Sequence, residues 1–335
     1  MNVNNWIESI LQSHIRYAIP IMTHPGIEML GYTVKDAVQN GEIHSKSIKA
    51  LNNKYPSKAS TMIMDLTVEA EAFGCKILFS NNGMPNISGK LINVSDIELL
   101  KVPSLSTGRV PEFLKASAMA VKMIRDKAVL SGVIGPFSLA GRLLGVSEIM
   151  TSCYLETEAI NLLLEKCTQF ILSYCEKLKK LGCMGVIIAE PAAGLLSNDD
   201  CMQFSSLYIK RIVEAVQDNQ FLVVLHNCGN TGHCTEAMLF TGAKAYHFGN
   251  AANMIQSLEQ CPSNVLVMGN IDPVGVLKMM SPTEVEIQVS MLLEQTSLFP
   301  NFILSTGCDV PPNVNISNIQ AFYNALMKFN KKCHK

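Results

Sequence analysis

Eight short apolar runs, separated by longer stretches with helical periodicity, restrict the fold of this chain more than any other feature. The runs span residues 17–22, 76–80, 128–135, 184–190, 220–226, 243–249, 264–270 and 301–306. Most are rich in Val, Ile and Leu without alternating polar positions, which is typical of parallel strands buried on both faces. Repeated strand–helix units form a doubly wound sheet or a barrel. Eight strands favour a single (β/α)8 TIM barrel, an α/β fold.

The stretches between these runs predict helices, most clearly over 156–180, 199–217 and 315–330. In the first of them, Leu163, Cys167 and Phe170 recur at spacings of three and four, as one buried stripe requires. No linker-like change of composition occurs between 130 and 330. Residues 1–335 are therefore expected to form one domain, in which residues 1–100 supply additional N-terminal helices packed on the barrel.

Composition argues against several classes of partner. The 335 residues carry a net charge of −1 and no basic tract, which disfavours nucleic acid and anionic membrane surfaces. No apolar run approaches the length of a membrane span, and the first residues lack the cationic start and apolar core of a signal peptide. We therefore expect a cytoplasmic protein whose 11 cysteines are reduced thiols.

Side chains capable of chemistry gather where the predicted strands end. They are Glu190, His226, Cys228, His247, Asp272 and Cys308. Active sites of (β/α)8 barrels lie at the C-terminal ends of the strands. These residues are therefore predicted to meet at one mouth of the barrel.

The run "VVLHNCGN" (223–230) ends with a histidine and a cysteine two positions apart, and Cys308 follows the last strand. Imidazole and thiolate are preferred zinc ligands, and a catalytic zinc keeps three protein ligands and one exchangeable position. His226, Cys228 and Cys308 would supply those three ligands if the strands that carry them met where the barrel closes. The sequence thus predicts a zinc site at the mouth.

Two other interpretations of this stretch stay open. His226, Cys228, His233 and Cys234 would form a closed structural zinc site, although "TGHCTEAMLF" resembles a helix start with Thr231 as its cap. Alternatively, Cys228 would be a covalent nucleophile activated by His226. No G-x-S-x-G, G-x-x-x-x-G-K-[ST] or G-x-G-x-x-G motif accompanies it.

The remaining candidates each have a functional and a structural interpretation. Glu190 either completes the metal shell or carries a proton, or else it caps a loop by accepting backbone N–H bonds. His247 either faces the substrate or supports a ligand, or else is a core histidine. His24 lines the pocket unless Pro25-Gly26 merely turns the chain. Asp272 is predicted to begin a helix, a structural role.

Six motifs together resemble the uroporphyrinogen decarboxylase superfamily, and within it the zinc-dependent corrinoid methyltransferases of the methylcobamide:coenzyme M type. They are "MDLTVEAEAFG" (64–74), "GPFSLAGRLLG" (135–145), "IIAEPAAG" (187–194), "HNCGN" (226–230), "MGNIDP" (268–273) and "STGCDVPP" (305–312). The resemblance runs through most of the chain. It implies that His226, Cys228 and Cys308 bind Zn²⁺. Glu190 and His247, by their position at the same mouth, are our candidate catalytic residues.

This resemblance implies methyl transfer between a methylcobamide on a separate corrinoid protein and a small substrate, expected to be a thiol. It also allows transfer from a methyl donor, such as a methoxyarene, to the corrinoid protein. A non-catalytic corrinoid-binding protein would instead hold a closed structural zinc. Decarboxylation of uroporphyrinogen is not expected, because Arg16 stands alone where that branch has an R-Q-A-G-R-type motif.

Overall fold

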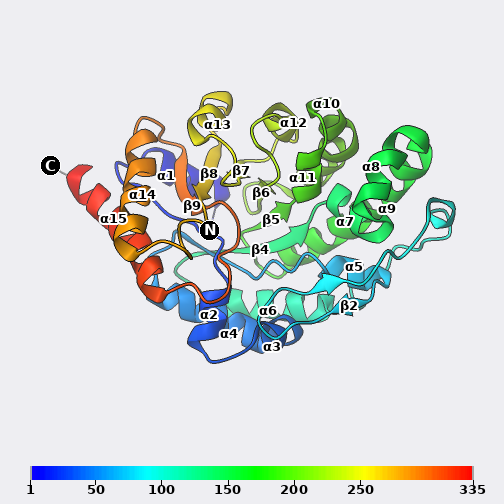
Figure 1. The fold of residues 1–335 in the computed structure, drawn as a ribbon, viewed down its shortest axis with the longest axis horizontal. Helices are drawn as coiled ribbons and strands as arrows, with labels where there is room; N and C mark the ends of the chain where they lie inside the picture. The colour runs from blue at the N-terminus through cyan, green and yellow to red at the C-terminus, as the bar shows by residue number, and fades with distance from the viewer. Residues whose placement is uncertain (1, 334–335) are drawn as a thin grey trace.

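A ring of parallel strands forms the centre of the computed structural model, which describes residues 2–333 (Figure 1). Seven strands follow in the order β1-β4-β5-β6-β7-β8-β9. They are β1 (Ala59–Thr61), β4 (Ala128–Ile134), β5 (Gly185–Ala189), β6 (Leu222–Asn227), β7 (Ala245–Phe248), β8 (Leu266–Ile271) and β9 (Phe302–Thr306). All neighbouring pairs are parallel, which agrees with the Val-, Ile- and Leu-rich runs of the sequence.

Residues 17–22 occupy the eighth position of the ring. Ala18 bridges to Leu304 of β9, and the Ile19 amide donates to the Leu304 carbonyl at 2.9 Å. On the other side, the Lys58 amide donates to the Ala18 carbonyl at 2.9 Å, immediately before β1. Pro20 has no N–H to donate, which limits the ladder of this segment. The predicted (β/α)8 barrel is confirmed.

One of the eight predicted strands is wrong. Within 76–80, only β2 (Ile77–Leu78) is extended, and it pairs antiparallel with β3 (Asn86–Ile87) outside the barrel. The barrel strand in this part of the chain is β1, whose three residues, Ala59, Ser60 and Thr61, form no apolar run. Because β1 is so short, its sequence carried no recognisable strand pattern.

The helices cover the outside of the ring and one of its ends. They are α1 (Val3–Leu11), α2 (His24–Met29), α3 (Val34–Gln39), α4 (Gly41–Lys54), α5 (Val68–Phe73), α6 (Val110–Met123), α7 (Pro136–Leu144), α8 (Val146–Leu155), α9 (Thr157–Lys180), α10 (Asn198–Cys201), α11 (Leu207–Val216), α12 (Thr235–Phe240), α13 (Met254–Gln260), α14 (Pro282–Gln295) and α15 (Ile316–Cys333). The helices predicted over 156–180 and 315–330 correspond to α9 and α15. The one predicted over 199–217 is divided by a π-helical turn, η3 (Met202–Ser206).

The N-terminal residues build on this barrel. The apolar side chains of α1, among them Trp6, Ile7 and Ile10, join the cluster inside the barrel. The Val3 amide donates to the Asn219 carbonyl, just before β6, at 2.8 Å. Helix α1 therefore covers the end of the barrel at which the strands begin, and it leaves the opposite end, where they finish, as the mouth.

Side chains on each strand alternate between two apolar layers. On β6, Leu222 and Val224 belong to the cluster inside the barrel, whereas Val223 and Leu225 belong to the cluster between the strands and the helices. This is the two-residue period of an extended chain. The same alternation decides which residues at the strand ends face the mouth.

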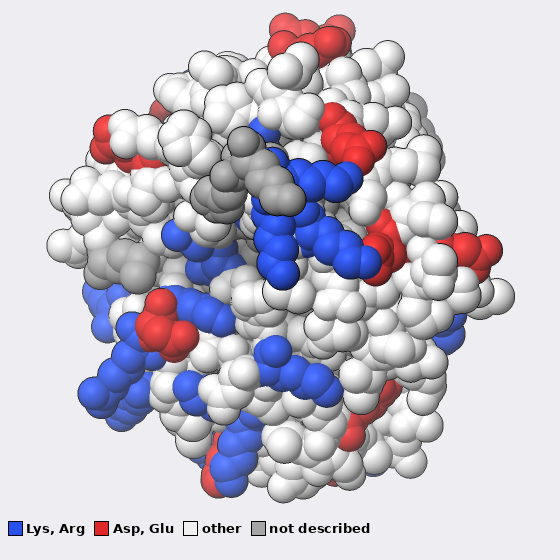
Figure 2. Space-filling model, turned by 90° about the vertical axis from the view of Figure 1, so that its left-hand side faces the viewer, with Lys and Arg blue, Asp and Glu red and all other residues white. Residues whose placement is uncertain are grey.

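Charge is distributed unevenly over the surface. Lys and Arg side chains gather on the face where α15 ends (Figure 2). Lys328 and Lys332 of α15 form ion pairs with Glu286 and Glu294 of α14. Some of these positive side chains therefore link the last two helices. Among the described residues, no helix is long and apolar enough to cross a membrane.

Candidate metal centre

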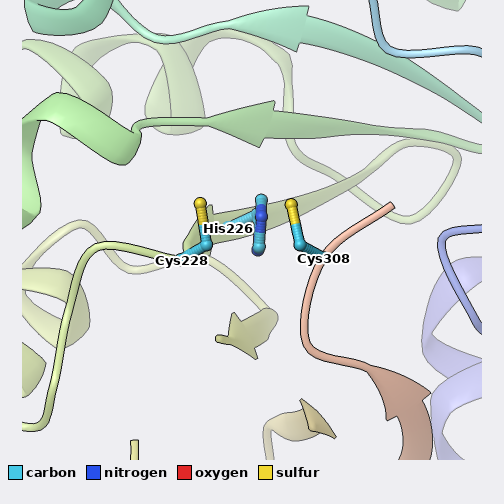
Figure 3. Close-up of side chains that lie close together, drawn as sticks. All are labelled: His226, Cys228 and Cys308. Atoms are coloured by element: carbon cyan, nitrogen blue, oxygen red, sulfur yellow. The ribbon is translucent and has the colours of Figure 1, made fainter. Parts of the chain in front are cut away.

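Three side chains that are distant in the sequence converge at the mouth (Figure 3). His226 lies near the end of β6, Cys228 comes directly after that strand, and Cys308 lies two residues beyond β9. One potential ligand atom from each lies within 4.8 Å of the other two. One imidazole and two thiols at such distances suit a zinc ion.

The strands that carry these residues are not neighbours, contrary to the expectation that they meet where the barrel closes. β7 and β8 lie between β6 and β9, and β9 instead borders residues 17–22. His226 faces inward, like Leu222 and Val224 before it, so it reaches across the opening. The side chains meet over the barrel lumen rather than across a shared strand edge.

Tight backbone turns hold the two cysteines in place. The Asn227 side-chain carbonyl accepts the amides of Gly229 and Asn230, each at 3.0 Å, which folds the chain around Cys228. A Cβ on Gly249 would lie 2.7 Å from the Cys228 carbonyl oxygen, and a Cβ on Gly307 would lie 2.4 Å from the Asn250 amide nitrogen. Both glycines therefore allow close backbone approaches that larger residues would prevent.

Cys228 and Cys308 differ from the other cysteines in their exposure. Of the ten described cysteines, all free, only these two are partly exposed. They form a hydrogen bond with each other, which lowers the pKa of the Cys228 thiol and raises that of Cys308. His226 also hydrogen-bonds Cys308, so the imidazole is not paired with Cys228 alone, as the alternative of a Cys228 nucleophile would require.

His247 lies behind His226 inside the barrel. Its Nδ1 is 2.8 Å from His226 Nδ1, and its Nε2 is 2.8 Å from the Ser305 hydroxyl. Burial, and then the neighbouring His226, hold the pKa of His247 well below its usual value. The side chain is 0% exposed, so the expected contact with a substrate does not fit this position. Ser305 was not predicted as a site residue, although alternation along "FILST" places it inside the barrel on the same side as Ile303.

Glu190 faces away from the three ligand atoms. It follows Val186 and Ile188, which point toward the helices, and it is not part of the group that could hold a metal ion. Its Oε1 accepts the Ser138 amide at 2.9 Å, in the first turn of α7. Desolvation raises the pKa of Glu190 to about 8. Direct ligation by Glu190 does not fit this geometry, whereas its hydrogen bond from a backbone N–H is the kind of contact that the loop-capping alternative requires.

The closed local site is not assembled either. His233 Nε2 lies 3.1 Å from the Leu196 carbonyl oxygen. The Cys234 thiol donates to the same carbonyl at 3.4 Å and hydrogen-bonds Cys201. Cys234, not Thr231, occupies the N-cap of α12. These two side chains therefore hydrogen-bond to the loop after β5 and do not form a metal site with His226.

Two further candidates have structural partners. His24 Nδ1 lies 2.9 Å from the Val310 carbonyl oxygen and 3.5 Å from the Asp309 carboxylate. His24 is buried, which by itself lowers its pKa. The hydrogen bond and the charge of Asp309 raise it, and the pKa of His24 lies above its usual value. Asp272 accepts the amides of Val274 and Gly275. It closes a turn rather than beginning a helix as predicted.

Similarity to known proteins covers nearly the whole chain. A family model described as uroporphyrinogen decarboxylase (URO-D) matches residues 13–329. A methylcobamide:CoM methyltransferase from Methanosarcina mazei is 28% identical over 299 residues, which are 88% of this chain and 86% of the relative. A uroporphyrinogen decarboxylase from Pseudoalteromonas translucida is 23% identical over 293 residues, 84% of this chain and 82% of that one.

The fold also has solved counterparts. A methyltransferase structure from Methanosarcina mazei superimposes with a TM-score of 0.88 at 22% identity and covers 98% of this chain and 99% of the other. A B12-independent methionine synthase from a Shewanella species gives a TM-score of 0.57 at 13% identity, with 96% of each chain covered. At these identities the two structures establish the shared fold alone.

Proposed function

The chain belongs to the uroporphyrinogen decarboxylase family, and we propose that within this family it is a zinc-dependent methyltransferase acting between a corrinoid protein and a small thiol. The observation that carries the proposal is the group formed by His226, Cys228 and Cys308, whose ligand atoms lie within 4.8 Å of one another. The 28% identity to a methylcobamide:CoM methyltransferase supports the same reaction class.

The donor set favours a catalytic over a structural metal. No fourth His, Cys, Asp or Glu joins the group among the residues that the structure describes. Structural zinc sites are closed by four protein ligands, whereas catalytic ones keep an exchangeable position. The partial exposure of Cys228 and Cys308 leaves that position open to a small molecule. This argues against a non-catalytic protein with a structural zinc.

The three residues of the group would have distinct roles as metal ligands. Cys228 and Cys308, as thiolates, and His226, as a neutral imidazole, would hold the metal. Zinc would supply a Lewis acid that keeps a thiol acceptor deprotonated at neutral pH. The partly exposed side of the site would then present the thiolate to a methyl group carried by the corrinoid protein.

Decarboxylation of a tetrapyrrole is not favoured by the position of Arg16. It precedes residues 17–22 and so lies at the end of the ring opposite the mouth. Its guanidinium donates to the Ser297 carbonyl at 2.6 Å, before β9 begins. An arginine there cannot bind substrate carboxylates at the mouth.

Metal analysis followed by an activity assay tests this function. We expect about one zinc per chain and zinc-dependent demethylation of methylcobalamin by at least one member of a panel of thiols. Formation of methylcobalamin from cob(I)alamin and a methoxyarene, with no thiol accepted, would instead establish the reverse type of transfer. Protein that binds no zinc, or that is equally active after chelation, would contradict the proposal.

A further inference from the structure

A line of hydrogen bonds runs from the candidate metal ligand His226 through the barrel interior to the opposite wall. His226 Nδ1 and His247 Nδ1 are 2.8 Å apart, and His247 Nε2 and the Ser305 hydroxyl are 2.8 Å apart. The Ser305 hydroxyl donates to the Ile19 carbonyl oxygen at 2.8 Å. The line joins β6, β7, β9 and residues 17–22, all within the buried interior.

The direction of every hydrogen bond follows from the last one. A carbonyl oxygen only accepts, so the single hydroxyl proton of Ser305 is used on Ile19. Ser305 must therefore accept from His247, whose Nε2 carries the proton. A neutral imidazole has one N–H, so His247 Nδ1 has a lone pair and accepts from His226 Nδ1.

A second contact points the same way without using Ser305. His226 Nδ1 also lies 3.3 Å from the His247 carbonyl oxygen, which can only accept. A lone pair on His226 Nδ1 would face that oxygen without a proton between them. Both contacts therefore place the proton on His226 Nδ1 and leave the lone pair on Nε2.

We propose that Ser305, acting through His247, fixes the Nδ1–H form of His226, so that His226 binds the metal through Nε2. This inference rests on the proposed function, since it assumes a metal at the three ligands. Ser305 and His247 are then positioning residues. Both side chains are 0% exposed, so neither reaches the substrate. Partners of this kind typically contribute 10- to 100-fold to metal affinity by holding the ring and its proton in place.

Histidine nitrogen NMR tests the protonation directly. In protein labelled with ¹⁵N-histidine, long-range ¹H–¹⁵N spectra distinguish the two ring nitrogens, and the signals that move on zinc addition identify the ligand. We expect a protonated Nδ1 and a zinc-bound Nε2. A zinc-bound Nδ1 with a protonated Nε2 would overturn the inference.

Variants of Ser305 test its contribution separately from folding. Ser305→Ala is expected to weaken zinc binding by about 10- to 100-fold in chelator competition while still taking up one zinc at saturation. Ser305→Thr keeps a hydroxyl and should restore most of the affinity. Ser131→Ala is the matched control, because the Ser131 hydroxyl is also buried on a strand but hydrogen-bonds Ser117, outside the line. The zinc affinity of this variant should equal that of the wild type.

The outcomes separate this inference from the proposed function. If the wild type binds zinc and transfers methyl groups but Ser305→Ala binds zinc as tightly, the inference fails and the function stands. If Ser305→Ala weakens zinc binding but no thiol or methyl donor supports turnover by the wild type, the function fails and the inference stands. Wild-type protein without zinc would overturn both.

Discussion

Two pairs of hydrogen-bonded thiols lie near the mouth of the barrel, and they differ in what surrounds them. Cys228 and Cys308 are partly exposed and have the His226 imidazole beside them. Cys201 and Cys234 are buried, and the Cys234 thiol donates to the Leu196 carbonyl. Sulfur alone therefore does not make a metal site. A third donor and access for the ion and its substrate separate the mouth pair from the buried pair.

Removing one thiol from each pair should give the largest contrast. Cys308→Ala is expected to weaken zinc binding by more than about 100-fold, since loss of a residue that only supports a ligand already costs 10- to 100-fold. Methyl transfer should fall with it. Zinc content after dialysis and chelator competition measures the effect. Full zinc in Cys308→Ala together with loss in Cys234→Ala would restore the closed local site.

Alkylation should distinguish the same two pairs in the unmodified chain. In metal-free protein, iodoacetamide should label Cys228 and Cys308 at least about tenfold faster than Cys201 and Cys234, because only the first two thiols are accessible to the reagent. Zinc should protect the mouth pair only. Mass spectrometry of timed samples gives the rates, and equal labelling of both pairs would remove the proposed distinction.

The buried pair, Cys201 and Cys234, should contribute to the stability of the fold and not to zinc binding. Cys234→Ala truncates a fully buried side chain and is expected to lower the free energy of unfolding by roughly 1–2 kcal/mol. Zinc affinity should stay at the wild-type value. Denaturant unfolding and chelator competition on the same preparation check both parts. A zinc affinity that falls along with the stability would connect the buried pair to the metal centre.

Glu190 is expected to show the smallest effect on the metal centre. Glu190→Gln should keep wild-type zinc affinity and turnover within about threefold, far from the 10²- to 10⁴-fold contribution of a general acid or base. A tenfold or greater loss of turnover in zinc-loaded protein would return Glu190 to the catalytic role expected from the sequence.

The same variant should change how stability depends on pH. With its pKa raised to about 8 by burial, Glu190 stays protonated in the folded protein while the unfolded chain ionises near 4.5. The unfolded state then binds fewer protons, so wild-type stability falls as pH rises from about 4.5 to about 8. Gln lacks this titration. Melting temperatures should therefore decline less steeply with pH in the variant than in the wild type.

Residue identity and spacing were enough to predict the barrel and the three candidate ligands. The apolar runs of β4 to β9 are continuous because both of their faces are buried, and that pattern is visible in one dimension. His226 and Cys228 were recognisable because they follow such a run directly. β1 was missed because a strand of three residues has no room for a pattern.

The direction in which side chains point at the strand ends was harder to predict from the sequence, although the alternation of inward and outward residues along each strand indicates it. Glu190 and His226 both end apolar runs. Counting back from Glu190 reaches Ile188 and Val186, which face the helices, whereas counting back from His226 reaches Val224 and Leu222, which face the lumen. The two-residue period of a strand thus separates a helix-capping carboxylate from a candidate ligand.

By itself, the sequence determined the strand–helix alternation and the kinds of donor atom available at the mouth, since both depend on local patterns of residue type. Only the tertiary structure decided that Cys308 meets His226 across β7 and β8, while Cys234, far closer along the chain, does not. The physical reason is that closure of the ring sets distances through strand order and tilt. The bonds from His226 to Ser305 depend on that closure as well, because they exist only where four segments face one lumen.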